Sequence, residues 1–189
     1  MEQDVAAPTR GYVLLFLTAV GWSGAWIIAR AAAYEAAPSA ITVGRFAVAA
    51  LALLPAWFLL ERSSRFRPTR GDWGLLLGMA LTGIVGYTLL FLTGIALAPA
   101  SDGAVITPAL AGIFAMLIAW PALRQRPTTQ QVAGALLSLA GVLLVGWAAL
   151  GAGGVGSERI TGDLLFVASA GTWGVYAVLG RRAADRIPP

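Results

Sequence analysis

The 189-residue sequence is 58% hydrophobic and 12% charged, whereas soluble domains carry about 25% charged residues. A chain of this composition, with a mean hydropathy of +0.78, is not built to fold in water. The absence of Cys and His excludes disulfides, and it removes the best ligands of zinc and the groups used by thiolate nucleophiles and imidazole triads. We therefore expect no metal site, no cofactor and no enzymatic activity.

The formal net charge is +4, and all 13 basic residues are Arg. Most of them lie in short gaps between apolar stretches, which is the pattern of membrane topology and not of a phosphate-binding face. The sequence thus predicts a lipid bilayer as partner and no nucleic acid.

Six apolar stretches follow one another, each close to the roughly 20 residues with which an α-helix crosses about 30 Å of hydrocarbon. They cover residues 12–29, 39–60, 73–97, 103–120, 131–150 and 163–180. The first is not a cleaved signal, because it is long, lacks a small-residue cleavage site and precedes five similar stretches. The sequence predicts an all-α, multi-pass membrane protein with about six transmembrane helices.

The arginines set the expected orientation. One side of the predicted topology holds only Arg159, whereas the other holds ten: Arg10, Arg62, Arg65, Arg67, Arg70, Arg124, Arg126, Arg181, Arg182 and Arg186. Short loops rich in Arg stay in the cytoplasm, so we expect a cytoplasmic amino terminus in the cell membrane. Ser101-Asp102 and Thr128-Thr129 are expected to cap the fourth and fifth helices.

The chain carries an internal repeat. At an offset of 151 residues, eight identities occur over 28 positions, among them Trp22 with Trp173 and Pro38 with Pro189. Five spans precede the second copy, so it is expected to enter the membrane from the opposite side, as in inverted-repeat transporters. We predict a first five-helix unit at 11–150, a Gly-rich linker at 151–161 and the beginning of a second, truncated unit at 162–189. The chain is then expected to be a fragment of a ten-helix protein or to pair with another copy as a homodimer.

Several short motifs follow one another along the chain: Gly21-Trp22-Ser23, Pro38, Gly44-Arg45-Phe46, the run from Gly94 to Ser101, Pro108, Gly134 and Gly141. In this order they resemble the EamA-type branch of the drug/metabolite transporter superfamily. The resemblance implies a ten-helix fold of two inverted units and export or permeation of small metabolites, commonly amino acids, through a central cavity. Gln125 departs from the family, whose members often carry Glu nine residues before the fifth-span glycine.

The first and last spans offer aromatic candidates for the substrate site. Trp22, Trp26 and Arg30 form one helical stripe, which suits either a cavity wall or an anchor at the membrane interface. Trp173, the repeat partner of Trp22, and Tyr176 are expected to face the same cavity from the second unit.

Arg45 is the most informative charge, because it lies inside the second span. A charge there costs roughly 2.5–3.5 kcal/mol and needs a partner, but no acid in the spans obviously serves. Arg45 is therefore a candidate for a substrate carboxylate, unless it binds helix-end carbonyls or reaches the interface.

Spans three and four add four further cavity-lining candidates. Tyr87 and Phe91 share one helical face, where packing is the alternative to binding. Thr107 and Pro108 lie mid-span, where the proline leaves a carbonyl that needs a polar neighbour, a water or a substrate. Asp102 at the start of span four is expected to interact with the helix dipole.

Small residues line one face of span five, among them Gly134 and Gly141, and predict close helix packing there.

The leading hypothesis for the whole chain is a cytoplasmic-membrane permease or exporter of small metabolites, working by alternating access. Its expected substrates are amino acids or related zwitterionic or anionic compounds. The alternative is a non-transporting membrane scaffold, or a truncated subunit that must pair with another copy.

Overall fold

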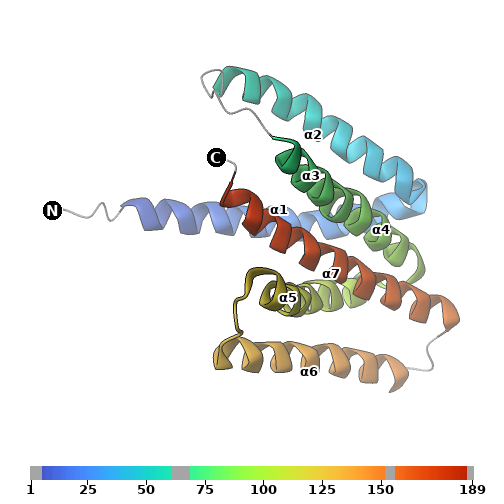
Figure 1. Ribbon diagram of the computed structural model, residues 1–189. Coiled ribbons are helices and arrows are strands. Elements are labelled where there is room, and N and C mark those ends of the chain that lie inside the picture. Colours follow the sequence, from blue (N-terminus) through green and yellow to red (C-terminus); the bar gives the residue numbers. More distant parts are fainter. Residues whose placement is uncertain (1–5, 61–68, 152–155, 187–189) are drawn as a thin grey trace.

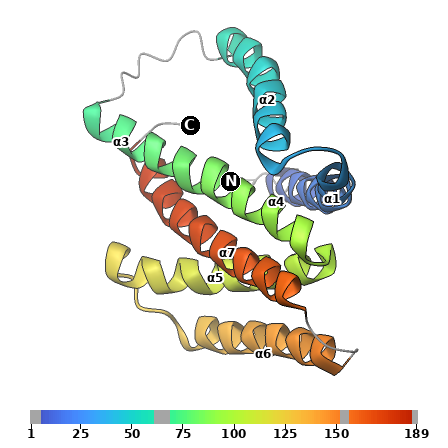
Figure 2. The ribbon, with the colours of Figure 1, turned by 90° about the vertical axis from the view of Figure 1, so that its right-hand side faces the viewer.

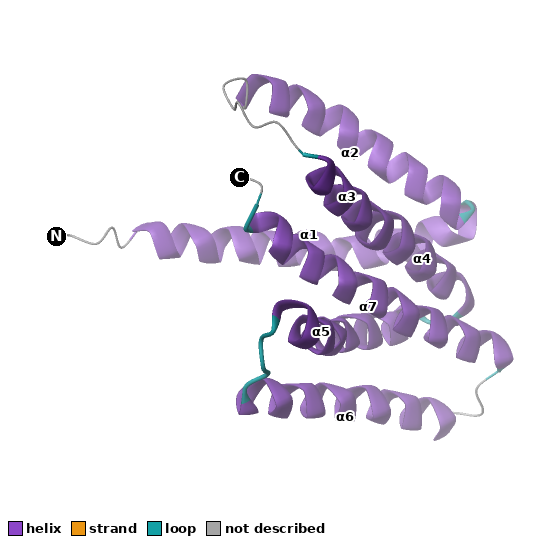
Figure 3. Ribbon diagram, in the orientation of Figure 1, coloured by secondary structure: helices purple, strands orange, loops and turns teal. Residues whose placement is uncertain are grey.

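In the computed structural model, every regular element of the described residues, 6–60, 69–151 and 156–186, is a helix (Figures 1 and 3). The elements are α1 (Ala6–Glu35), α2 (Pro38–Leu60), α3 (Arg70–Met79), η1 (Ala80–Gly86), α4 (Tyr87–Leu97), α5 (Ala100–Leu123), α6 (Thr129–Gly151) and α7 (Ser157–Ala184). This confirms the predicted all-α class. Three predicted features lie outside the described residues: Arg62, Arg65 and Arg67 of one loop, residues 152–155 of the Gly-rich linker, and the side chain of Trp26. Residues 157–161, predicted as linker, belong instead to α7.

Within the described part of the chain, five helices are long and apolar enough to cross a membrane. One of the five is the continuous rod of α3, η1 and α4, Arg70–Leu97, and α1 adds a shorter apolar stretch, Gly11–Gly24. The six apolar stretches of the sequence thus fall on six successive rods, and each rod begins between one and six residues before the predicted start. The protein is a multi-pass membrane protein.

Local sequence explains where two of these helices begin. The hydroxyl of Thr69 accepts from the backbone N–H of Asp72 at 3.3 Å, and the Asp72 carboxylate accepts from the backbone N–H of Thr69 at 2.8 Å. This reciprocal capping box starts α3. The hydroxyl of Thr128 accepts from the backbone N–H of Gln131 at 3.3 Å, which confirms the predicted cap of α6.

The predicted cap of the fourth span is wrong. The helix starts earlier than expected, with Pro99 at the N-cap position, so Ser101 and Asp102 lie inside the first turn of α5. An acidic residue in the first turn still interacts favourably with the helix dipole, as expected for Asp102.

Helix α7 occupies the centre of the described fold. It packs against the rod of α3, η1 and α4 on one side and against α5 on the other (Figures 1 and 2). The tightest packing surrounds Phe166, which is completely buried. A Cβ atom at Gly94 or Gly103 would lie 2.8 or 2.6 Å from this ring, so the phenyl group fits only because both positions are glycine.

The contacts also fix the direction of the helices. Arg30, at the end of α1, donates to the carbonyls of Ile95 and Ala98 at the end of α4, so α1 and α4 run in the same direction. Gly94 of α4 approaches Phe166, near the start of α7, so α4 and α7 run in opposite directions. Helix α7 therefore crosses the fold opposite to α1 (Figure 1). Six alternating spans require this orientation with or without a repeat, so the inverted repeat stays a prediction.

A π-helical segment, η1, interrupts the third span. The N–H of Tyr87 donates to the carbonyl of Thr82, the i to i−5 pattern that defines a π-turn. A Cβ atom at Gly83 of this segment would lie 2.4 Å from the ring of Tyr176, so the glycine lets α7 approach η1 closely. The segment ends at Gly86, directly before Tyr87, which lines the two chambers described below.

Helix α6 lies at the periphery, packed chiefly on α5 and on the opposite side of the fold from α2 (Figure 2). The close packing expected at Gly134 and Gly141 is not found among the described residues, since an added Cβ at either position meets nothing within 4 Å. Gly134 instead faces an open cavity between α5, α6 and α7.

Candidate substrate site

Three aromatic side chains from three helices meet near the middle of the fold. The ring centroids of Trp22 and Trp173 are 5.4 Å apart in an edge-to-face arrangement, and those of Tyr87 and Trp173 are 4.8 Å apart. Such pairs are attractive because the positive ring edge meets the negative ring face. This cluster joins α1, α4 and α7 at one point.

The first chamber opens on the α2 side of this cluster and has a volume of about 270 Å³. Its lining residues are Trp22, Arg45, Phe46, Gly83, Ile84, Tyr87, Thr88, Phe91, Trp173 and Tyr176. Six of these side chains are aromatic and one is a cation, and none is acidic. The first chamber thus offers ring faces for stacking and a guanidinium for an anion.

The second chamber lies on the α5 side of the same cluster and measures about 340 Å³. It is lined by Trp22, Tyr87, Ala104, Thr107, Pro108, Ala111, Gly112, Ala115, Trp173 and Ala177. The two chambers share only the three clustered aromatic side chains, which form the partition between them. Each chamber is close to the lower end of the roughly 300–1,000 Å³ typical of small-molecule sites.

Polar groups in the chambers are few. Arg45 has no hydrogen bond or ion pair with any described residue. Thr107 is buried, and its hydroxyl lies 3.5 Å from that of Ser169, which also donates to the carbonyl of Phe166 at 2.7 Å. The unpaired guanidinium is therefore the main polar feature available to a solute in the first chamber.

Eight of the nine candidates from the sequence lie around these two chambers, and the ninth, Trp26, has a side chain outside the described residues. The eight are Trp22, Arg45, Tyr87, Phe91, Thr107, Pro108, Trp173 and Tyr176. Helix α5 continues through Pro108, so the proline lines both the second chamber and the neighbouring cavity without ending the helix.

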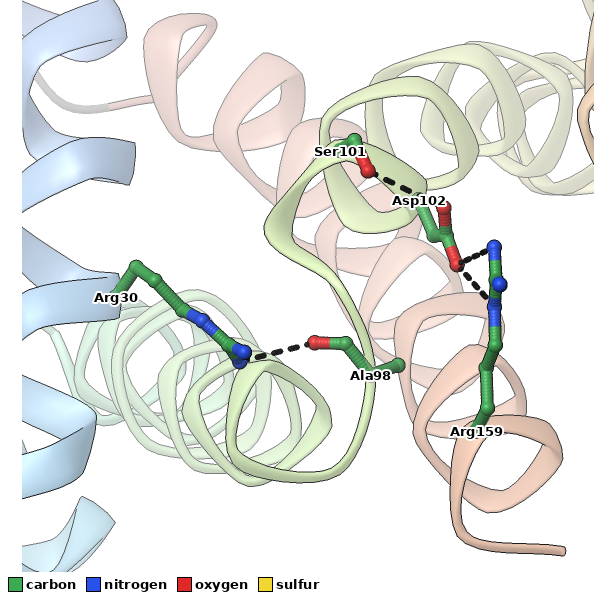
Figure 4. Close-up of polar contacts among 5 residues, drawn as sticks. All are labelled: Arg30, Ala98, Ser101, Asp102 and Arg159. Carbon is green, nitrogen blue, oxygen red and sulfur yellow. Dashed lines mark hydrogen bonds and ion pairs between the residues drawn. The ribbon is translucent and has the colours of Figure 1, made fainter. Parts of the chain in front are cut away.

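Arg30 lies away from both chambers. Its guanidinium donates to the carbonyl of Ala98 at 3.2 Å and to that of Ile95, at the end of α4 (Figure 4). These carbonyls have no partner within their own helix, and a basic group satisfies them well. Arg30 thus joins α1 to α4 instead of facing a solute.

The sequence did not lead us to predict the ion pair between Arg159 and Asp102, which lies beyond the chambers at one end of the fold. The guanidinium of Arg159 binds the carboxylate of Asp102 through Nη2 at 2.7 Å and Nε at 2.8 Å (Figure 4). Both residues lie in the first turns of helices that begin on the same side of the predicted topology. This shared position could have suggested the pair. The pair links the first turns of α5 and α7.

Sequence reasoning also missed part of the lining. Phe46 follows Arg45 in a family motif, and Gly83 lies one helical turn before Tyr87, so the sequence could have marked both as lining residues. Thr88 is buried in the first chamber, and no feature of the sequence pointed to it.

Between the chambers and the ion pair, the fold is filled. Leu92, Ile95 and Phe166 are fully buried and form one apolar cluster with Phe91 and Ile106. The chambers are therefore closed on the side of the Arg159 ion pair.

The sequence of residues 9–147 matches the model of the EamA-like transporter family. The chain belongs to the EamA-like transporter family. This agrees with the resemblance drawn from the motifs, and the match covers the part of the chain predicted to form the first five-helix unit.

Several curated proteins are similar to this family member. An uncharacterized transporter of Archaeoglobus fulgidus is 28% identical over 178 residues, which cover 92% of this chain and 58% of the relative. The uncharacterized transporter YyaM of Bacillus subtilis is 30% identical over 77% of this chain and 47% of its own length. The aromatic amino acid exporter YddG of Ancylobacter novellus is 35% identical over 56% of this chain and 36% of its own length.

The chain thus spans about half the length of the curated relatives it matches. No solved structure matches it.

Proposed function

We propose that this EamA-family chain forms all or part of a cytoplasmic-membrane permease or exporter, which moves small metabolites by alternating access. Its substrates are amino acids or related zwitterionic or anionic compounds, and aromatic amino acids fit the first chamber best. The amino terminus lies in the cytoplasm. The two chambers, separated by Trp22, Tyr87 and Trp173, form part of the substrate pathway.

One observation carries this proposal: the first chamber combines six aromatic side chains with Arg45, which has no ion-pair partner among the described residues, and has no acid in its lining. A cationic substrate without a carboxylate would be repelled by Arg45, and the lining has no acid to pair with it. A carboxylate can accept charge-assisted hydrogen bonds from the guanidinium, and an aromatic substituent can stack on the surrounding rings. The chamber therefore favours a substrate that carries both groups.

One relative supports the same substrate class, since YddG of Ancylobacter novellus is an aromatic amino acid exporter. The arginine distribution supports the orientation, because the described arginines Arg70, Arg124, Arg126, Arg181 and Arg182 lie at the ends of the rods that the positive-inside rule assigns to the cytoplasm.

The test is a flux assay in proteoliposomes with a panel of labelled compounds, with and without a proton gradient. The panel contains phenylalanine, leucine and phenethylamine, which keeps the ring and amine of phenylalanine but lacks the carboxylate. We expect phenylalanine to be moved fastest and phenethylamine slowest. Movement of phenethylamine at the rate of phenylalanine would contradict the proposed role of the carboxylate.

Arg45→Ala sharpens this test. A hydrogen bond to a charged group contributes about 1.5–3 kcal/mol, which corresponds to a roughly ten- to hundredfold loss of kcat/KM for phenylalanine. Movement of phenethylamine should stay the same or rise, because the variant removes a like charge from the first chamber. Arg124→Ala, which removes the same charge from an exposed site outside the chambers, is the control.

A further inference from the structure

A cavity of about 830 Å³ lies between α5, α6 and α7. It reaches the ends of the helices, where the α5–α6 connection contributes Gln125 and Arg126 and the end of α7 contributes Arg181. Figure 1 places the end of α5, the start of α6 and the end of α7 on the same side of the fold. We call this cavity the vestibule.

The vestibule adjoins the second chamber. Both are lined by Pro108, Gly112, Ala115 and Ala177, so the same stretches of α5 and α7 form a wall of each. Three of these four positions are Gly or Ala, which leaves little side-chain bulk between the two spaces. The vestibule and the second chamber are therefore neighbours, separated by these stretches of α5 and α7.

The charge of the vestibule is one-sided. Arg126 and Arg181 are exposed and line its mouth, Gln125 and Gln131 add amide groups, and its lining has no acid. Its deeper walls are apolar, built from residues of α5 and α6. A cleft that is lined by one sign of charge and has low-dielectric walls concentrates ions of the opposite sign. The association rate of these ions rises by roughly 10- to 1,000-fold.

We propose that the vestibule is an access subsite, in which Arg126 and Arg181 capture the carboxylate of the substrate before it reaches the aromatic partition. This inference rests on the proposed function and adds a second binding position to it. The two arginines raise the local concentration of carboxylate solutes at the cytoplasmic face and take no part in the step past Trp22 and Trp173.

A thiol-reactivity experiment tests the electrostatics without requiring transport. The sequence has no Cys, so Ser138→Cys, in the vestibule wall, introduces a single thiol. Its reaction rates are measured with anionic sulfonatoethyl methanethiosulfonate and with cationic trimethylammonioethyl methanethiosulfonate. We expect the ratio of anionic to cationic rates to fall roughly tenfold when Arg126→Gln and Arg181→Gln are added.

The matched control removes the same charge from the same face. Arg124 lies two residues before Arg126, and Arg182 follows Arg181. Neither is in the vestibule lining, so Arg124→Gln with Arg182→Gln should leave the ratio unchanged. An equal ratio in all three proteins would overturn the proposal. An equal fall in the control pair would also overturn it, because the effect would then belong to the whole surface.

Transport kinetics provide the second readout, with phenylalanine as the probe in phosphatidylcholine vesicles at low salt. Arg126→Gln with Arg181→Gln should raise KM roughly tenfold with kcat unchanged, and added salt should abolish the difference. If the effect requires phosphatidylglycerol in the vesicles, the arginines hold a lipid headgroup and the proposal is wrong.

The two readouts separate this inference from the proposed function. If no compound of the panel is moved while the reactivity ratio behaves as expected, the proposed function fails and the vestibule is still a basic cavity. If phenylalanine is moved normally and the double Gln variant changes neither readout, the access subsite alone is refuted.

Discussion

Replacing Arg159 by Gln should destabilise the protein more than removing any other described arginine at a helix end. Its guanidinium meets the Asp102 carboxylate at 2.7 Å, and the Asp102 side chain is 6% exposed whereas that of Arg159 is 27% exposed. At an effective dielectric constant of about 20, two unit charges about 4 Å apart attract by about 4 kcal/mol. Since the arginine is partly exposed, about half of this, roughly 2 kcal/mol, is a realistic contribution to the free energy of unfolding.

The neighbouring Asp163 adds to this effect. It lies four residues after Arg159 on the same face of α7, and one of its carboxylate oxygens is buried without a hydrogen-bond partner among the described residues. Asp163 also interacts electrostatically with both Asp102 and Arg159. Arg159→Gln therefore leaves two like charges close together with no cation between them, and we expect a loss of about 2–3 kcal/mol.

The assay is denaturant-induced unfolding in detergent micelles, followed by tryptophan fluorescence. Asp102→Asn is expected to cost less than Arg159→Gln, because it leaves Arg159 free to pair with Asp163. Arg181→Gln is the control and should change stability by less than about 0.5 kcal/mol. If Arg159→Gln unfolds at the same midpoint as Arg181→Gln, the ion pair contributes nothing and the reasoning is refuted.

Two further predictions concern packing and use the same unfolding assay. Gly162→Ala should cost at least about 2 kcal/mol, because its Cβ would lie 2.5 Å from that of Ala98 and overpacking is destabilising. Gly141→Ala meets nothing within 4 Å and should instead stabilise the helix by roughly 0.5–1 kcal/mol; equal shifts in the two variants would contradict this packing. Phe166→Ala should lower the free energy of unfolding by about 3–5 kcal/mol, because the ring is fully buried and its removal leaves a cavity. An unchanged unfolding midpoint would contradict this expectation.

The helices could be predicted from the sequence, because a span is a long-range average over apolar residues that does not depend on any single contact. Their ends could be predicted only where side chains cap them, as with Thr128. At α5 the expected cap failed because Pro99 occupies the N-cap position and the helix begins before Ser101.

The site could be predicted in part. Trp22 and Tyr87 were found because large aromatic side chains repeat at helical spacing, and Arg45 because a charge inside a span is costly. The role of Arg30 could not be found, since its partners are backbone carbonyls of α4, and every residue type has a carbonyl. The vestibule could not be found either, because it depends on the distance between α5 and α6, which the small residues of α6 led us to expect to be short.

The π-helical segment gives the third span one more residue than a regular helix of the same length. Loss of one residue from η1 would therefore convert it to regular α-helix and leave Asp72 and Tyr87 on their present faces. Loss of one residue from α3 or α4 would instead rotate one end of the rod relative to the other by about 100°, because successive residues of an α-helix are turned by that angle. The rod thus tolerates a single-residue deletion between Ala80 and Gly86 far better than a deletion elsewhere between its capped end and its aromatic end.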